Sequence, residues 1–208
     1  MLYYSVYKLS DLKQGEVSRI RDKIQCNFTE KVNLKSDESA VSKALLCKLL
    51  KKYYNLDEFI VDCNEKGKPF IADSNIGFNV SHSGDMIMCV CGDGAVGCDV
   101  QQIKPYNERV TKRFFTPCEN ELIKKCEDKA RVFTVLWCLK ESALKYSGEG
   151  ITGGLDRYDF SAYYDKESFD MCGMHFYRIE SSDYVYALCC SDSAKNIQAV
   201  SMDSLKII

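Results

Sequence analysis

Three strand-like runs follow one another between residues 77 and 100 with no helix between them, and this clustering constrains the fold most. They read "GFNVS", "MIMCVCG" and "GAVGCDV". Gly92-Asp93-Gly94 separates the last two runs and predicts a hairpin, because tight turns favour residues that accept a positive φ. Strands that cluster, instead of alternating singly with helices, favour an α+β fold with antiparallel sheet.

The segments on either side of these runs divide the chain into two similar halves. The first half has a strand pattern at its start, a weakly amphipathic stretch near residues 14–26 and a strong helix capped by Ser36. The second half has helices and then strands, which the patterns place at 116–128, 130–148, 157–161, 174–179, 184–190 and 197–201. Each half therefore has helices and a small sheet, which predicts two lobes, residues 1–94 and 95–208.

Charge and cysteine content narrow the class of protein. The net charge of −2 argues against general nucleic-acid binding. The first 52 residues are net basic, which suits either an anionic ligand or ordinary solvated helix faces. The twelve cysteines include no CxxC pair, and only two histidines accompany them, so a zinc site is disfavoured. With no export signal and no long apolar run evident, we expect reduced thiols, a cytoplasmic location and no membrane span.

Asp99 is a carboxylate at a position where the strand pattern predicts burial. In "GAVGCDV" the valines and Cys98 share one face, and Gly97 and Asp99 share the other. Gly97 would leave open space beside the carboxylate. A buried carboxylate is costly unless it is paired or holds a metal. From spacing alone, a turn cap or an ion pair with lysine is the commoner role.

Glu141 and Lys145 are four residues apart in "WCLKESALK" and so share one helix face. An exposed ion pair is the simple interpretation. The helix is apolar around much of its circumference, however, which places Glu141 at an interface. A half-buried Glu facing a buried Asp would be repelled unless a cation lay between them, and magnesium suits two carboxylates and phosphate oxygens.

Two further polar segments have both a local and a functional interpretation. "FNVSHSGD" predicts a Ser-His-Ser turn around His82 that forms either a phosphate cradle or a local hydrogen-bond network. Glu119 lies three residues after Thr116, as the return half of a capping box does. The sequence contains no GxSxG motif and no P-loop.

Taken in order, these segments resemble the 4′-phosphopantetheinyl transferases, specifically the surfactin-synthetase-activating (Sfp) type. The resemblance covers residues 67–151 and rests on the blocks "GKPF", "FNVSHSG", "VGCDV", "KRFFTPCE" and "LWCLKESALKYSGEGI". It implies two pseudo-symmetric α+β lobes with a ligand cleft between them. It also implies a monomeric enzyme that moves the 4′-phosphopantetheine arm of coenzyme A to a serine of an apo carrier protein, releasing adenosine 3′,5′-bisphosphate.

The resemblance implies roles for individual residues. Asp99 and Glu141 match the family's Mg²⁺ ligands, and Lys145 matches a lysine that contacts the phosphates. Glu119 matches a carboxylate near the metal site. Residues that match or lie beside nucleotide-binding positions are Lys43, Lys68, Ser81 and His82. The nucleophile belongs to the carrier, and Glu141 is the candidate base.

Gln101 departs from the pattern, because many relatives have glutamate there. An amide oxygen can still reach a metal, so we expect two carboxylate ligands and weaker Mg²⁺ binding. One alternative is a catalytically impaired module that binds coenzyme A or a carrier protein. Another is a different Mg²⁺-dependent phosphoryl-transfer enzyme.

Overall fold

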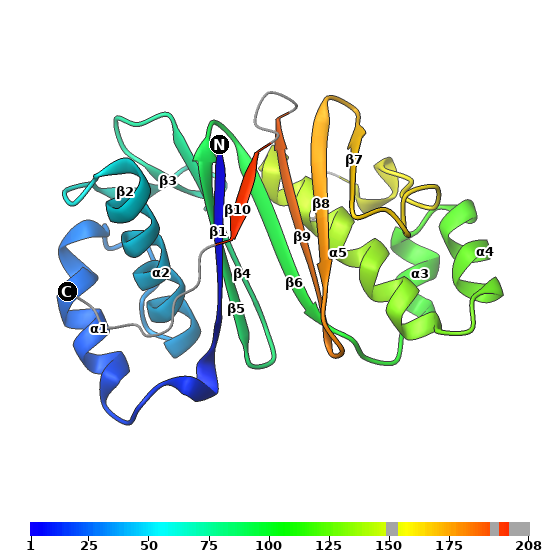
Figure 1. Ribbon diagram of the computed structural model, residues 1–208, viewed down its shortest axis with the longest axis horizontal. Helices are drawn as coiled ribbons and strands as arrows, with labels where there is room; N and C mark the ends of the chain where they lie inside the picture. Colours follow the sequence, from blue (N-terminus) through cyan, green and yellow to red (C-terminus); the bar gives the residue numbers. More distant parts are fainter. Residues whose placement is uncertain (149–153, 192–195, 200–208) are drawn as a thin grey trace.

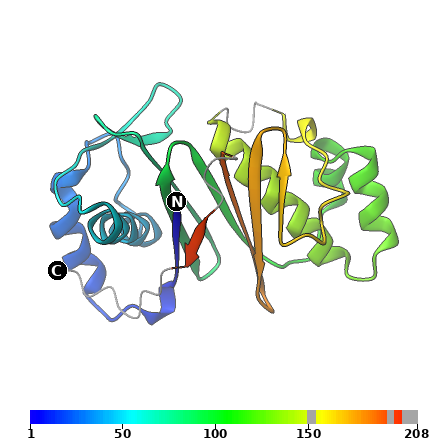
Figure 2. The same ribbon diagram turned by 45° about the horizontal axis from the view of Figure 1, so that its top comes forward.

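Two four-stranded sheets stand side by side at the centre of the protein, and helices cover their outer faces (Figures 1 and 2). The computed structural model describes residues 1–148, 154–191 and 196–199. Its arrangement is α+β in two lobes, as predicted. Among the described residues, no helix combines the length and apolar character needed to cross a bilayer.

The N-terminal lobe has a sheet of order β10-β1-β5-β4 and a separate small hairpin, β2-β3. Neighbouring strands are antiparallel except β10, which runs parallel to β1. The elements are β1 (Leu2–Lys8), α1 (Glu16–Ile24), α2 (Asp37–Tyr54), β2 (Val61–Cys63), β3 (Pro69–Ile71), β4 (Ile76–Ser83), β5 (Met86–Asp93) and β10 (Ile197–Ala199), with short 3₁₀ turns at Leu9–Asp11 and Gln25–Asn27.

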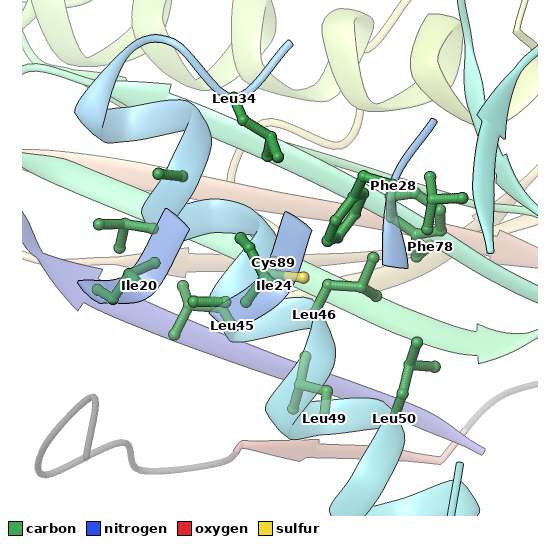
Figure 3. Packing of buried hydrophobic residues seen from close by; sticks show 14 of the residues in the cluster. Ile20, Ile24, Phe28, Leu34, Leu45, Leu46, Leu49, Leu50, Phe78 and Cys89 are labelled. Carbon is green, nitrogen blue, oxygen red and sulfur yellow. The ribbon is translucent and has the colours of Figure 1, made fainter. Parts of the chain in front are cut away.

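Helix α2 forms the core of this lobe, and its N-terminal cap at Ser36 forms as predicted. The Ser36 hydroxyl accepts a hydrogen bond from Ser39 N, and Asn55 ends the helix with a φ of 52°. Leucines of α2 pack against α1 and against the inner sheet strands (Figure 3). Removing this apolar surface from water is the main source of the lobe's stability.

The C-terminal lobe has an antiparallel sheet of order β6-β9-β8-β7, covered by helices on one face. The elements are β6 (Val96–Gln102), α3 (Glu108–Phe114), α4 (Pro117–Lys125), α5 (Lys129–Ser147), β7 (Ser168–Met171), β8 (Met174–Glu180) and β9 (Tyr184–Ser191), with a 3₁₀ turn at Leu155–Arg157. The predicted strands at 174–179 and 184–190 are confirmed. The structure describes only Ile197–Ala199 of the strand predicted at 197–201.

Several local predictions were wrong. The predicted strand at 157–161 is a 3₁₀ turn and irregular chain, whereas α3 and β7 were missed. Strands β5 and β6 do not form a hairpin, because β5 pairs with β1 and β4 while β6 pairs with β9. The turn at Gly94, with a φ of 82°, instead carries the chain from one sheet to the other.

A third apolar core joins the two sheets. It contains one face each of β1, β5, β6 and β9, with Leu2, Met88, Val90, Val96, Cys98, Val100, Tyr186, Leu188 and Cys190 buried. All twelve cysteines are free, and several of them lie in the three cores. The division of the chain at residues 94 and 95 stays a prediction, and β10 lies in the N-terminal sheet.

Side chains connect β4 to β6 where backbone pairing is absent. Alternate residues of β4 face β6, and each accepts a hydrogen bond from a β6 amide. Cys98 N donates to Asn79 Oδ1 at 3.1 Å, Val100 N to Ser81 Oγ at 3.3 Å, and Gln102 N to Ser83 Oγ at 3.1 Å. We call Asn79, Ser81 and Ser83 the β4 seam. It satisfies an otherwise open strand edge and fixes the lobes in register.

Candidate functional site at the junction of the lobes

Asp99 lies at the middle of β6 and is buried, with 2% of its surface exposed. Its Oδ1 accepts hydrogen bonds from the Lys145 ammonium and the Ser81 hydroxyl, both at 2.7 Å. Its Oδ2 accepts one from Gln101 Nε2 at 2.9 Å. The carboxylate is thus ion-paired and hydrogen-bonded at both oxygens, which is the condition for burying such a charge.

Gly97 brings helix α5 against β6, which corrects the expectation of open space beside Asp99. A Cβ at this position would lie 2.1 Å from the Ser142 carbonyl oxygen and 2.5 Å from Tyr146 N. Both are backbone atoms of α5, so no side-chain movement would relieve the overlap. The missing side chain therefore lets α5 approach closely enough for Lys145 to reach Asp99.

Glu141 and Lys145 face β6 from α5, one turn apart, as their spacing predicts. Glu141 is half-buried and forms neither a hydrogen bond nor an ion pair with any residue that the structure describes. Burial raises its pKa, and the nearby Asp99 charge adds to this shift. Burial alone would lower the pKa of Lys145, but the neighbouring acidic groups, Asp99 foremost among them, together outweigh that effect and raise it.

Gln101 presents a donor, not an acceptor, to Asp99. Its Nε2 donates to the carboxylate, and its Oε1 is 3.5 Å from the Ser83 hydroxyl, a long contact. The position next to the buried charge thus holds a neutral amide that steadies Asp99.

Ser81 and His82 are neighbours in sequence but point to opposite faces of β4. Ser81 is buried in the Asp99 cluster and also accepts a hydrogen bond from Lys145 Nζ at 2.9 Å. His82 is exposed and lies near Glu38, in the first turn of α2. The expected Ser-His-Ser turn is therefore part of a strand.

Lys68 links the lobes at the end of α5. Its ammonium donates to the carbonyl oxygens of Lys145 at 2.6 Å and Tyr146 at 3.1 Å. Cations at this end of a helix are stabilised by the last free carbonyls. Burial lowers the pKa of Lys68.

A cavity of about 250 Å³ opens between the lobes beside these groups. Its lining comes from the N-terminal lobe at residues 66–69 and Asn79, and from α5 at Glu141, Leu144 and Lys145. A wider cavity of about 770 Å³ lies elsewhere in the N-terminal lobe and includes none of the predicted site residues.

Lys43 and Glu119 lie apart from the Asp99 cluster. Lys43 is nearly buried in α2, close to Cys89 and Cys63, and burial lowers its pKa. Glu119 is completely buried and does form the capping box with Thr116. Its carboxylate also accepts a hydrogen bond from Phe160 N at 2.9 Å.

Sequence reasoning missed Lys140, the partner of Glu119. Both side chains have no exposed surface, and Lys140 Nζ lies 2.8 Å from Glu119 Oε2. Lys140 also donates to the carbonyl oxygens of Leu155 at 2.8 Å and Tyr158 at 2.6 Å. In "WCLKES" it resembles one half of a surface charge pair. The apolar residues around it were the only signal of burial.

Comparison with known proteins relates this geometry to a family. A family model for the 4′-phosphopantetheinyl transferase superfamily matches residues 95–189, a segment that includes Asp99, Glu119, Glu141 and Lys145. The 4′-phosphopantetheinyl transferase Sfp of Bacillus subtilis (strain 168) is 29% identical over 99% of this chain and 100% of its own length. Another 4′-phosphopantetheinyl transferase of Bacillus subtilis is 32% identical over 76% of this chain and 75% of its own. The 4′-phosphopantetheinyl transferase HetI of Nostoc sp. is 35% identical over 43% of this chain and 42% of its own.

Proposed function

Because the chain belongs to the 4′-phosphopantetheinyl transferase superfamily, and so to the transferases, we propose that it transfers 4′-phosphopantetheine from coenzyme A to a serine of an apo carrier protein. The observation that carries this proposal is the cluster of Asp99, Glu141 and Lys145 beside the cavity between the lobes. The ammonium group can stabilise negative charge on a phosphate, and the two carboxylates can bind a divalent ion or accept a proton.

In the proposed reaction, the serine oxygen bonds to the β-phosphorus of coenzyme A. The bond from that phosphorus to the bridging oxygen breaks, and the oxygen leaves with adenosine 3′,5′-bisphosphate. Glu141 is the candidate base for the serine proton, because it is half-buried, has a raised pKa and has no hydrogen-bond partner among the described residues. Lys145 is the candidate group that stabilises negative charge on the phosphates.

The donor atoms at the site fit a divalent metal ion such as Mg²⁺. Asp99 and Glu141 offer carboxylates from facing elements, and Asp99 is close enough to raise the pKa of Glu141. Hard cations prefer such oxygen ligands and commonly bind to a few carboxylates together with substrate phosphates. Within the described residues no third His, Cys, Asp or Glu completes a cluster. When bound, the ion would neutralise negative charge on the pyrophosphate.

We assign the remaining predicted residues by what they contact. Lys68 lines the cavity, and this location supports a role for it in binding a nucleotide phosphate. His82 lies on the opposite face of β4, and Lys43 lies in α2. A ligand would have to extend along the N-terminal lobe to contact either residue. Ser81 steadies Asp99. Glu119 acts through its buried bond with Lys140, since its oxygens already accept from Lys140, Thr116 N and Phe160 N.

One observation favours an alternative function. Gln101 gives the site a neutral amide where the family resemblance leads us to expect a third carboxylate, which would suit an impaired module that binds coenzyme A or a carrier protein. We favour the transferase because Asp99, Glu141 and Lys145 are all present and clustered. We also propose a cytoplasmic monomer that needs no nucleic acid or membrane.

A mass measurement tests the proposal. The protein is mixed with Mg²⁺, coenzyme A and a panel of apo acyl and peptidyl carrier proteins, and the carrier masses are followed. We expect a phosphopantetheinyl adduct on at least one carrier and none with Asp99→Ala or Glu141→Ala. Coenzyme A binding without any adduct would support the binding module instead.

A further inference from the structure

The Lys145 ammonium is the positive charge paired with Asp99, the carboxylate proposed to bind a metal ion. Its Nζ is 2.7 Å from Asp99 Oδ1 and 2.9 Å from Ser81 Oγ. Ser81 also donates to Oδ1, and the Gln101 amide donates to Oδ2. Every oxygen of this buried carboxylate therefore already accepts a hydrogen bond. A cation that binds Asp99 Oδ1 therefore competes with the Lys145 ammonium for the same oxygen.

The charges at the site oppose a simple exchange. A divalent ion beside Asp99 would lie within a few ångströms of the Lys145 ammonium, and charges of the same sign repel strongly where solvent is largely excluded. The lysine must move to another negatively charged group for the ion to bind well. Its side chain can do so, since it lines the cavity and is 28% exposed.

We propose that Lys145 is the internal counter-ion of Asp99 and makes divalent-cation binding depend on coenzyme A. The pyrophosphate of coenzyme A draws the ammonium into the cavity, and Asp99 then becomes available to the ion. Each ligand raises the affinity for the other, as linkage requires. This inference rests on the proposed function, because it takes coenzyme A as the anion.

Direct metal binding tests this inference without reference to catalysis. Mn²⁺ replaces Mg²⁺ as a probe, and free Mn²⁺ is counted by electron paramagnetic resonance. A rise in affinity when coenzyme A is added to the unmodified protein is necessary but not sufficient, because the pyrophosphate is itself a metal ligand. The decisive comparison is Lys145→Met against the unmodified protein with Mn²⁺ alone.

We expect Lys145→Met to bind Mn²⁺ about tenfold more tightly than the unmodified protein without coenzyme A, and to gain less when coenzyme A is added. Lys145→Arg should retain weak binding, because the positive charge stays. Lys66→Met is the matched control. It removes an exposed lysine that lines the same cavity and is not among the groups bonded to Asp99. It should leave Mn²⁺ affinity unchanged.

Two results would overturn the inference: Lys145→Met binding Mn²⁺ no better than the unmodified protein, or Lys66→Met improving binding to the same extent. If Lys145→Met does not fold, Lys145→Gln gives the same comparison, because it keeps a neutral donor for Asp99. Failure of the proposed function would appear separately, as no adduct on any carrier. The Mn²⁺ comparison without coenzyme A remains valid in that case.

Discussion

The buried ion pair of Glu119 and Lys140 makes the sharpest stability prediction. Glu119→Gln leaves the Lys140 ammonium in a site with no exposed surface and without its counter-charge. Breaking a buried pair from one side costs about 3–5 kcal/mol of unfolding free energy. At roughly 2–4 °C per kcal/mol for a chain of this size, the melting temperature should fall by about 6–20 °C.

Lys140→Met should cost more than Glu119→Gln, since it also leaves the Leu155 and Tyr158 carbonyl oxygens without their donor. Each such loss adds about 1–3 kcal/mol. The double variant should be more stable than the sum of the two losses predicts, because neither charge is then left unpaired. Urea unfolding followed by circular dichroism measures all three differences.

The same helix α4 supplies a matched control. Glu121 pairs with Lys124 on the surface, with side chains 56% and 67% exposed. Glu121→Gln should change stability by no more than about 1 kcal/mol. A loss from Glu119→Gln as small as this would refute the buried-pair reasoning. Loss of activity in folded Glu119→Gln, at a temperature well below its melting point, would point to a role for Glu119 at the metal site.

Three further predictions concern the site itself. Gly97→Ala should lower the melting temperature and the rate of carrier modification together, because the new methyl group displaces α5 from β6; a normal rate would contradict the proposed close approach. Glu141→Gln should raise the melting temperature at neutral pH. The pKa of Glu141 in the folded state lies above its ordinary value of 4.5, so ionised Glu141 destabilises the folded protein at neutral pH. The stability advantage of the variant should vanish below about pH 4.5, where the Glu141 carboxyl is protonated in both the folded and the unfolded protein. Gln101→Glu should lower the Mg²⁺ concentration needed for activity, and an unchanged titration would exclude contact with the metal.

Local patterns in the sequence were sufficient to predict much of the site. Period-two alternation placed Asp99 on the face opposite Cys98, and the four-residue spacing placed Glu141 and Lys145 on one face of α5. The Thr116 capping box and the Ser36 cap were also predicted, because each depends on residues within one helical turn. These features depend on chain geometry that neighbouring residues determine.

Long-range pairing could not be predicted in the same way. Gly92-Asp93-Gly94 has the composition of a hairpin turn, yet β5 finds better partners in β1 and β4, so the chain passes to a new sheet. Gly97 was interpreted as open space because nothing local indicates that α5 packs there. Lys140 pairs with a carboxylate 21 positions earlier in the chain, a distance at which no periodicity links two charged residues.

The β4 seam has a consequence for engineering. Hydrogen bonds between strands normally join two backbones, so substitution cannot delete them one at a time. Here Asn79, Ser81 and Ser83 provide one partner of each bond between β4 and β6. Each bond can therefore be removed or lengthened by a single codon change. Ser83 and Asn79 offer a graded means of adjusting how widely the two lobes are spaced, while Ser81 keeps Asp99 in place.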